Sequence, residues 1–298
     1  MRIFITGGTG YIGSAVVRAL VEAGHSVTGL VRSLEKAAAL RSLGGMPVYG
    51  DLKEPSTYVE VAADHEACIH AAFEYGDRAT DVDRMAVETL LAAARAGAGP
   101  RSVVYTSGVW VLGNTGERPV DEEASTARAA PIVVWRPRHE RLVFDAGSDE
   151  LATAVIRPGM VYGGKGGLVS RLFASAVEEG AAVFVGSGAN RWSLVHRDDL
   201  AHLYRLVVEK RARGVFHGVD GAPVAVADVA RAASQAVGKG GATRSIPLEE
   251  ARRQTGPLAD ALCLDQLVAT RRSAAIGWKP EHASFPDSVR AACEEWRA

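Results

Sequence analysis

Cysteine is scarce in this chain, and the sequence has no long apolar run. Its three cysteines, Cys68, Cys263 and Cys293, are widely spaced and form no disulfide or metal-binding pattern, as is typical of a reducing cytoplasm. No apolar run approaches the roughly 18 residues of a membrane span. The first residues lead directly into a glycine-rich turn and do not resemble a signal peptide. We therefore expect a cytoplasmic protein that binds no metal.

An excess of one charge is also absent, because 34 basic residues face 35 acidic residues and the net charge is -1. This balance argues against a surface built for nucleic acid or for an anionic membrane, so the expected partner is a small molecule. Hydrophobic residues make up 47% of the 298 residues, which supports a sizeable core and excludes a disordered chain. Arg far outnumbers Lys and Ala is abundant, as is typical of a GC-rich bacterial genome.

Short apolar runs alternate with amphipathic helical stretches through the first half of the chain. The runs with strand character are residues 2–6, 26–31, 47–49, 67–71, 102–106 and 152–156. The helical patterns between them are residues 11–23, 33–43, 82–96 and 137–146. This alternation predicts an α/β fold with a parallel, doubly wound sheet, whose ligand site lies at the carboxyl ends of the strands.

The pattern changes beyond Gly163, where glycine and proline become frequent and the strand patterns shorten. We expect residues 164–188 and 221–298 to form a smaller substrate lobe. Residues 189–220 combine a helical and a strand pattern, and we expect them to return to the main domain of residues 1–163.

The most specific motif is a glycine-rich turn with the sequence Thr-Gly-Gly-Thr-Gly-Tyr-Ile-Gly. It lies between a predicted strand and a predicted helix, which is the context that a dinucleotide-binding turn requires. Gly7 suits the tight turn, Gly10 lets backbone approach a diphosphate, and Gly13 allows close helix packing. The start of the helix adds free N–H groups and the positive end of its dipole. The predicted cofactor ligands here are Thr6, Gly7, Gly10, Tyr11, Ile12 and Gly13.

The end of the second strand indicates which cofactor is bound. An acidic residue there would accept hydrogen bonds from the ribose 2′-hydroxyl of NAD. This chain instead has Arg32 and Ser33. A guanidinium pairs well with a 2′-phosphate, so NADP is the expected cofactor, with NAD as a possibility. In the alternative interpretation, Arg32 is only a solvated surface charge.

Two more strand ends carry residues suited to a cofactor. Asp51 and Leu52 follow the third strand, where the Asp51 carboxylate suits the adenine amino group or caps the next helix. Ala71 and Ala72 follow the fourth strand, and their small side chains would let a cofactor lie flat. His70 precedes them and is expected to be a packed strand residue.

Further motifs occur in order along the chain: Val104-Tyr105-Thr106-Ser107, Arg157-Pro158-Gly159, Val195-His196-Arg197-Asp198-Asp199 and Ile276-Gly277-Trp278-Lys279-Pro280. Together with the glycine turn, they resemble the extended short-chain dehydrogenase/reductase family, the NAD-dependent epimerase/dehydratase group. The resemblance implies a Rossmann fold and a pyridine nucleotide cofactor that Pro158 and Arg136 help to bind. It also implies a possible homodimer, formed through two helices beside the sheet.

The resemblance further implies a catalytic Tyr and, four residues later, a Lys on the helix after the fifth strand, and this chain lacks that pair. When Glu140 is matched to the Glu of the family, the Tyr position is Ile132 and the Lys position is Arg136. A register shifted by three residues gives Trp135 and His139 instead.

Other positions of the family pattern are altered too. The catalytic serine position falls on Gly108, and the Asn of the preceding helix falls on Asp83. Sugar-nucleotide enzymes have an Asn after the sixth strand, where this chain has Met160, and their diphosphate-binding Arg falls at or near Trp192. Met160 and Trp192 could line a hydrophobic pocket for a substrate less charged than a sugar nucleotide; in the alternative interpretation they belong to the packed core.

An active enzyme would therefore need another proton donor within reach of the substrate. Isoleucine carries no proton, and a guanidinium is a poor proton relay, although Arg136 could bind ribose hydroxyls. The candidates are Tyr162 after the sixth strand, Ser107 as a hydroxyl that polarises a carbonyl, and His139 in the shifted register. A packed ring is the alternative for Tyr162, and a local backbone hydrogen bond is the alternative for Ser107.

Three functions remain open from the sequence. The first is an NADP-dependent oxidoreductase that acts on a small hydroxyl or carbonyl compound and uses a non-standard proton donor. The second is a non-catalytic NADP-binding redox sensor or regulatory protein, which the missing Tyr and Lys favour. The third is a redox-neutral epimerase or lyase.

Overall fold

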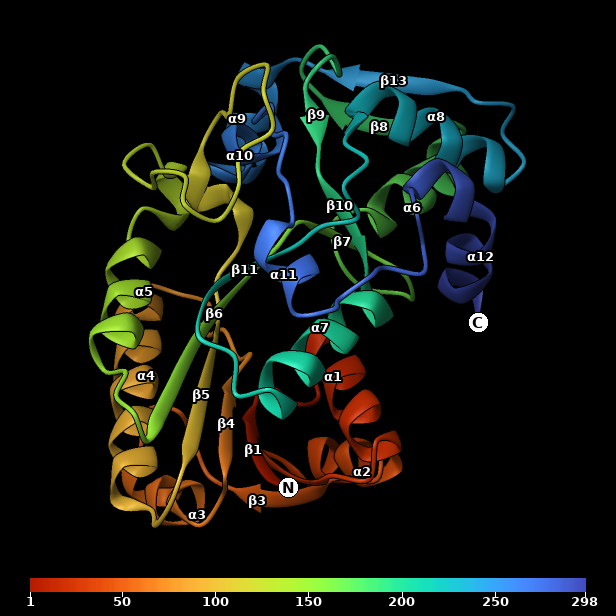
Figure 1. Cartoon of the computed structure of the whole chain (residues 1–298). Helices are drawn as coiled ribbons and strands as arrows, with labels where there is room; N and C mark the ends of the chain where they lie inside the picture. The colour runs from red at the N-terminus through yellow and green to blue at the C-terminus, as the bar shows by residue number, and fades with distance from the viewer.

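The computed structural model describes residues 1–298, and its main body is a seven-stranded parallel sheet with the order β11-β6-β5-β4-β1-β2-β3 (Figure 1). The strands are β1 (Arg2–Thr6), β2 (Ser26–Val31), β3 (Met46–Tyr49), β4 (Ala67–His70), β5 (Arg101–Thr106), β6 (Leu151–Pro158) and β11 (Gly214–Gly218). From β1 the chain winds first toward β3 and then, on the other side, toward β6. A doubly wound sheet binds its ligand beside such a switch point. The predicted fold class is confirmed.

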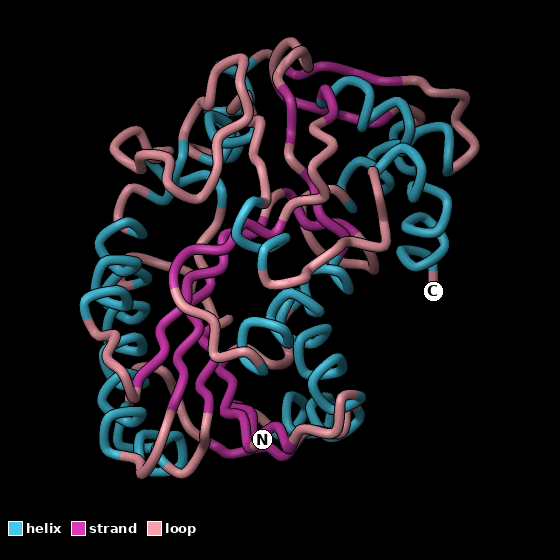
Figure 2. The backbone as a smooth tube through the Cα atoms, in the orientation of Figure 1, coloured by secondary structure: helices cyan, strands magenta, loops and turns pink.

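Helices cover both faces of this sheet (Figures 1 and 2). One layer contains α1 (Tyr11–Glu22), α2 (Leu34–Ser42) and α7 (Arg197–Glu209), which share a core with β1 and β2. The other layer contains α3 (Val59–Ala63), α4 (Ala79–Ala96) and α5 (Arg136–Asp145), which pack on β4 and β5. Three short 3-10 helices lie in the connections: η1 (Pro55–Thr57), η2 (Val109–Leu112) and η3 (Pro131–Val133).

Burial on both faces explains the strand patterns of the sequence. The last four residues of β1 and all eight residues of β6 are buried, as expected for strands covered by helices on two sides. The apolar run that predicted β6 ends at Ile156, yet the strand continues through Arg157. A charged residue can extend this buried strand because Arg157 is paired with Glu140 of α5.

A second group of elements lies above the carboxyl ends of the strands (Figure 2). Its strands are β7 (Met160–Tyr162), β8 (Ala182–Val185), β9 (Arg191–Trp192), β10 (Leu194–His196), β12 (Val224–Ala225) and β13 (Thr243–Ile246). Its helices are α6 (Ser170–Glu179), α8 (Val226–Ala236), α9 (Leu248–Thr255), α10 (Leu258–Leu262) and α12 (Phe285–Arg297), while α11 (Arg271–Ala275) packs on β11. These strands pair two by two, and α6, α8 and α12 enclose a core of their own.

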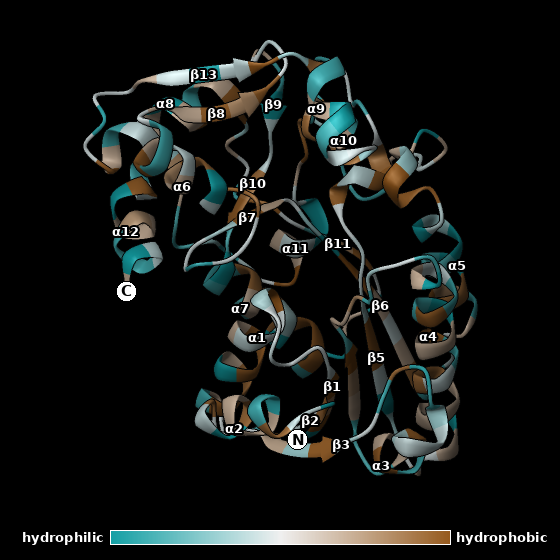
Figure 3. Cartoon of the chain, turned by 180° about the vertical axis from the view of Figure 1, so that it is seen from behind, coloured by the Kyte–Doolittle hydropathy of each residue, from teal (hydrophilic) through white to brown (hydrophobic).

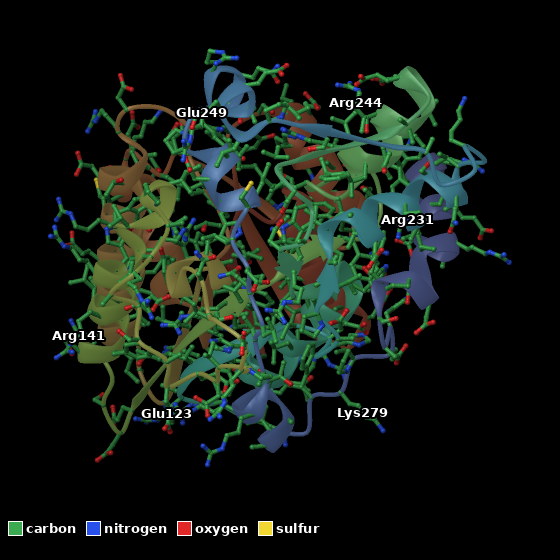
Figure 4. All side chains as sticks on the ribbon, turned by 90° about the horizontal axis from the view of Figure 1, so that it is seen from above. Glu123, Arg141, Arg231, Arg244, Glu249 and Lys279 are labelled. Carbon is green, nitrogen blue, oxygen red and sulfur yellow. The ribbon has the colours of Figure 1, made fainter.

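Apolar and charged residues are separated as in a water-exposed fold. Apolar colour follows the strands of the sheet, and hydrophilic colour covers outer turns such as those of α9 (Figure 3). The charged side chains labelled in Figure 4, among them Arg141 and Arg244, lie at the periphery of the molecule. None of the helices combines the length and the apolar composition required to span a bilayer.

Candidate cofactor and active site

A cavity of about 500 Å³ opens where β1, β2, β3 and β4 end. Eight of the predicted cofactor residues line it: Thr6, Gly7, Gly10, Arg32, Asp51, Leu52, Ala71 and Ala72. The structure adds residues that the sequence did not single out: Thr9, Leu30, Val31, Lys36, Phe73, Glu74 and Tyr75. Residues far apart in the chain thus share one cavity, at the edge of the sheet where the fold places its ligand.

The glycine turn leaves no room for side chains at two of its positions. Gly7 has a positive φ of 76°, and a Cβ atom there would lie 2.5 Å from the backbone nitrogen of Ala72. A Cβ atom at Gly13 would overlap the carbonyl oxygen of Gly7. Helix α1 therefore begins directly against the turn. Its N-cap, Gly10, has no side chain to cap the first N–H groups, which leaves them for an anion.

The backbone of Tyr11 belongs to the cradle, by which we mean the glycine turn and the first residues of α1. Its side chain instead holds a second segment against the start of this helix. The hydroxyl of Tyr11 donates a 2.8 Å hydrogen bond to the carbonyl oxygen of Gly163. The guanidinium of Arg197 lies 5.8 Å from the centre of the Tyr11 ring, and burial raises the pKa of this phenol. The ring thus fastens the glycine-rich segment after β7 to the start of α1, with Ile12 and Gly13 following in the same helix.

A basic edge forms where β2 ends. Arg32 and Lys36 both line the cavity, and the side chain of Ser33 caps α2 by accepting the Lys36 backbone N–H at 3.2 Å. Glu74 reaches this edge from the segment after β4. Its carboxylate lies 2.9 Å from the Arg32 guanidinium and 2.8 Å from the Lys53 ammonium.

Arg136 is the first residue of α5, and its side chain lies beside the end of β5. Its Nη1 donates hydrogen bonds to the carbonyl oxygen of Thr106 at 2.8 Å and to the hydroxyl of Tyr105 at 3.0 Å. Its guanidinium also lies 4.5 Å from the centre of the Trp135 ring and 5.6 Å from that of Phe73, which lines the cavity. These contacts hold the Arg136 side chain beside the end of β5, and the register that gives it the Lys position stays a prediction.

The rotation of α5 about its axis is fixed by a buried ion pair. Arg157 of β6 forms a buried, bidentate ion pair with Glu140, with Nη2 2.6 Å and Nε 3.0 Å from the two carboxylate oxygens. A pair of this geometry fixes the rotation of the helix. One turn earlier, the same helix begins with Arg136 at the site, and Ile132 precedes it in η3 with 36% of its surface exposed.

A buried carboxylate connects this site to the glycine turn. Asp83 of α4 accepts hydrogen bonds from the Tyr105 hydroxyl at 2.9 Å and from His139 Nδ1 at 2.7 Å. Its other oxygen lies 3.4 Å from His70 Nε2, and His70 Nδ1 lies 2.6 Å from the hydroxyl of Thr6. Burial opposes ionisation of Asp83, but the hydrogen bond from His139 and the nearby His70 imidazole outweigh it and hold the pKa of this carboxyl far below its usual range.

The candidate proton donors occupy different places. The ring of Tyr162 is fully buried in the second core, edge-on to Phe285 and His196, and burial raises the pKa of its hydroxyl. The structure therefore does not bring Tyr162 to the cavity. Ser107 follows β5 directly after Thr106, and its Oγ is buried without a hydrogen-bond partner.

Two neighbouring positions define the space around Ser107. A Cβ atom at Gly108 would meet only the carbonyl oxygen of Pro158, at 3.9 Å, so a side chain fits at the serine position of the family pattern. Pro158 itself ends β6 beside this open position and lies outside the cavity that Gly7 and Arg32 line.

The positions that bind a sugar diphosphate in the resembled enzymes are engaged elsewhere. Trp192 is buried, and its Nε1 donates a hydrogen bond to the carbonyl oxygen of Leu262 at 3.0 Å. The neighbouring Arg191 is held by the carboxylate of Asp265, at 2.8 Å and 2.5 Å. Met160 belongs to the same buried cluster as Trp192. Trp192 and Met160 thus belong to the packed core, and the nearest cation is already paired.

Comparison with known proteins agrees with this geometry. The profile described as "NAD dependent epimerase/dehydratase family" matches residues 3–218. The chain belongs to this family. An uncharacterised protein of Schizosaccharomyces pombe is 33% identical to this chain, over 96% of the chain and 97% of that relative.

One further relative and one solved structure extend the comparison. The 4-hydroxy-2-methyl-3-oxo-4-farnesyl-3,4-dihydroquinoline-1-oxide ketoreductase of Stigmatella aurantiaca is 31% identical, over 85% of this chain and 78% of that enzyme. The crystal structure of the dTDP-glucose 4,6-dehydratase of Bacillus anthracis, in complex with NAD, superposes with a TM-score of 0.83 and 16% identity. This superposition covers 100% of this chain and 96% of that one, and shows a common fold.

Sequence reasoning missed the side chains that complete the site by tertiary contact. Lys36 lies in the first turn of α2, four residues after Arg32, and this short separation was a usable signal for a second cation at the same edge. Asp83 was named at the Asn position of the family pattern, but its burial was missed, although the helical period puts it on the same face of α4 as Val82, Ala86 and Val87. Glu74 lies in an irregular segment, where no pattern pointed to its partners.

Proposed function

We propose that the protein is an NADP-dependent oxidoreductase that acts on a small, weakly polar carbonyl compound or the corresponding alcohol. The cavity at the ends of β1 to β4 is the observation that carries this proposal. At one end the cavity has a glycine cradle without side chains and an uncapped helix start, which suit a diphosphate. Arg32 and Lys36 line it as well, and their cations suit a further phosphate.

The residues after β2 support NADP over NAD. No carboxylate follows β2 to accept hydrogen bonds from a ribose 2′-hydroxyl, since Arg32 and Ser33 occupy that place. The planar guanidinium of Arg32 can bind two phosphate oxygens at once, and the Lys36 ammonium adds a mobile point charge. In an NAD complex Lys36 would stay solvated and Arg32 would keep Glu74 as its partner, whereas an NADP complex would pair both cations with the phosphate.

The chemistry divides between cofactor and protein. A bound nicotinamide supplies or accepts the hydride, so the protein has to bind the nucleotide and orient the substrate carbonyl. Arg136 is fixed by Thr106 and Tyr105 through a single nitrogen, which leaves further N–H donors of its guanidinium for ribose hydroxyls. In this role it replaces the Lys that the family pattern places here.

Ser107 is the residue that we assign to the substrate oxygen. Its buried hydroxyl has no partner in the protein, and an unpaired buried hydroxyl is costly unless a ligand satisfies it. A hydrogen bond from Ser107 would stabilise negative charge that develops on the carbonyl oxygen. Ile132 has no proton to give, so the final proton comes from water, and we expect a slower turnover than a tyrosine would support.

The surroundings of Arg136 indicate the polarity of the substrate. Phe73, Tyr75, Ile132 and Val134 are exposed apolar residues, and Phe73 stacks on Trp135 with the ring centres 6.2 Å apart. The cation nearest the sugar-diphosphate position is paired, as described above. An apolar ketone or secondary alcohol fits this entrance better than a sugar nucleotide, in agreement with the farnesylated ketone substrate named for the Stigmatella relative.

A non-catalytic NADP-binding regulatory protein is the second candidate function. The observation that favours it is the loss of two proton-handling side chains, since Ile132 and Gly108 stand at the Tyr and Ser positions of the family pattern. A redox-neutral epimerase or lyase is the third candidate, and it requires a cofactor that stays bound through purification.

The test is a nucleotide titration followed by an assay of NADPH oxidation with a panel of small aliphatic and aromatic ketones. Arg32→Ala should weaken NADPH binding by about tenfold and leave NADH binding nearly unchanged. Arg41→Ala is the matched control, because this arginine is exposed on α2, the helix that follows Arg32, and lies outside the cavity. NADPH binding without oxidation across the panel would favour the regulatory protein, and absence of binding by either nucleotide would reject both candidates.

A further inference from the structure

Glu74 bridges strand ends that are not neighbours in the sheet. It follows β4, whereas Arg32 follows β2 and Lys53 follows β3, and β1 lies between β4 and β2. One carboxylate oxygen of Glu74 lies 2.9 Å from Arg32 Nη1, and the other lies 2.8 Å from Lys53 Nζ. These two ion pairs thus connect the segment after β4 to the residues that follow β2 and β3, at the basic edge of the cavity.

The same edge contains every group that a 2′-phosphate would meet. Its cations are Arg32, Lys36 and Lys53, and its acids are Asp51 and Glu74. Asp51 is held in its own turn, where it accepts the backbone N–H of Lys53 at 2.9 Å. Glu74 is therefore the acid that neutralises the side-chain cations. The hydrogen bond from Lys53 and the charge of Arg32 together outweigh its partial burial and lower the pKa of Glu74, which keeps it ionised.

In both ion pairs another anion can readily replace the Glu74 carboxylate. The side chains of Arg32 and Lys53 are 60% and 43% exposed, while that of Glu74 is 18% exposed. Solvent-exposed ion pairs contribute little to stability. A phosphate has more acceptor oxygens and more charge than a carboxylate, so it competes well for the same two cations.

We propose that Glu74 occupies the place of the cofactor's 2′-phosphate in the free protein, and that Lys53 is a third ligand of that phosphate. This inference rests on the proposed NADP dependence and adds to it a specificity-determining acid and base. NADP releases Glu74 from Arg32 and Lys53, because its phosphate takes over both cations. NAD, which lacks the phosphate, leaves the bridge in place. Glu74 therefore weakens NADP binding and has little effect on NAD binding.

The residues on either side of Glu74 contact the surroundings of Arg136. Glu74 lies between Phe73 and Tyr75, whose rings contact each other edge to face at 5.0 Å. Phe73 stacks on Trp135 and lies 5.6 Å from the Arg136 guanidinium.

The experiment measures dissociation constants of NADPH and NADH by calorimetry on the full chain, for the wild type, Glu74→Gln and Lys53→Gln. Glu74→Gln should tighten NADPH binding by about tenfold, and Lys53→Gln should weaken it by about tenfold. NADH binding should change by less than about twofold in both variants, since exposed charges at this distance act weakly on it. Glu35→Gln is the matched control, because it removes one exposed negative charge near the same edge without touching Arg32 or Lys53.

The outcomes separate this inference from the proposed function. If the wild type binds neither nucleotide, the proposed function fails and this inference falls with it. If the wild type prefers NADPH but Glu74→Gln leaves the preference unchanged or lowers it, only the role of Glu74 is overturned. An equal gain of NADPH affinity in Glu35→Gln would also overturn it, because a general change in charge would then explain the effect.

Discussion

His139 Nδ1 lies 2.7 Å from Oδ2 of Asp83, and both side chains are almost completely buried. The carboxylate belongs to α4 and the imidazole to α5, so the pair joins the two helices beneath the candidate active site. Tyr105 donates to the same oxygen, and its hydroxyl in turn accepts a hydrogen bond from Arg136. Tyr105 thus links the Asp83 carboxylate to Arg136, so the position of Arg136 depends on this buried charge.

Asp83→Asn should destabilise the fold by about 3 kcal/mol, because it leaves buried hydrogen-bond donors without their charged partner. Urea denaturation followed by circular dichroism measures the change. Glu88→Gln on the same helix is the control, since Glu88 pairs with Arg84 on the exposed surface, and its loss should cost less than about 0.5 kcal/mol. Equal effects of the two substitutions would contradict the role given to Asp83.

Gly7→Ala should abolish nucleotide binding, because the added methyl group meets the backbone of Ala71 and Ala72 inside the cradle. Gly24→Ala is the matched control. Gly24 has a similar positive φ of 83°, but a Cβ atom there meets nothing within 4 Å, so its effect reports backbone strain alone. Fluorescence titration with NADPH distinguishes the two variants. Retained affinity in Gly7→Ala would show that the cradle does not hold the cofactor.

Restoring the family's catalytic side chains should increase turnover if the register of α5 is right. The triple variant Ile132→Tyr, Arg136→Lys and Gly108→Ser puts a phenol, an ammonium and a hydroxyl at the three positions. Gly108 has an extended backbone and open space for a side chain, so the serine fits without strain. We expect at least about a tenfold higher kcat for ketone reduction, the lower range of general acid catalysis.

A matched variant tests the register itself. Trp135→Tyr with His139→Lys installs the same pair in the shifted register, where it would break the contact between His139 and Asp83. We expect this variant to lose stability and gain no activity. Activity gained here, and absent from the triple variant, would show that the shifted register is right.

Asp220 should make the fold less stable as pH rises from about 4 to about 7. Burial raises the pKa of Asp220 to about 7, although the Ala222 N–H donates to one of its oxygens. The unfolded chain releases this proton near pH 4, whereas the folded protein holds it until about pH 7, so the unfolded state is favoured over that window.

Asp220→Asn removes this cost, and it should raise the melting temperature at pH 8 by roughly 3 °C with little change at pH 4. Asp149→Asn, at an exposed position, should change neither value. Thermal melting at both pH values tests the sign. A lower melting temperature of Asp220→Asn at pH 8 would mean that the buried carboxylate stabilises the fold.

The sequence was informative where one local pattern decides the structure. The strands and helices of the main sheet follow from apolar periodicity, and the tight turn at Gly7 follows from a positive φ that glycine adopts without strain. Glu140 was the reference that put Arg136 at the Lys position, and that register stays a prediction; in the structure Glu140 is fixed by Arg157.

The remainder of the site arises from contacts between distant segments. The sequence named Asp83 as an altered position of the family pattern and His70 as a packed strand residue. It did not show that they meet, because a buried polar network becomes visible only when β4, α4 and α5 are brought together. Tyr162 was named as a proton donor on its position after β6, yet the next segments bury its ring in the second core. The strands of that region contain two to four residues, which is too short for a period to be read.

The most direct test of this account is a crystal structure of the protein with NADPH. The account predicts electron density for the diphosphate at the first N–H groups of α1, and for the 2′-phosphate between Arg32 and Lys36. Density for NADPH elsewhere on the protein, or an empty cavity in crystals grown at saturating NADPH, would contradict it.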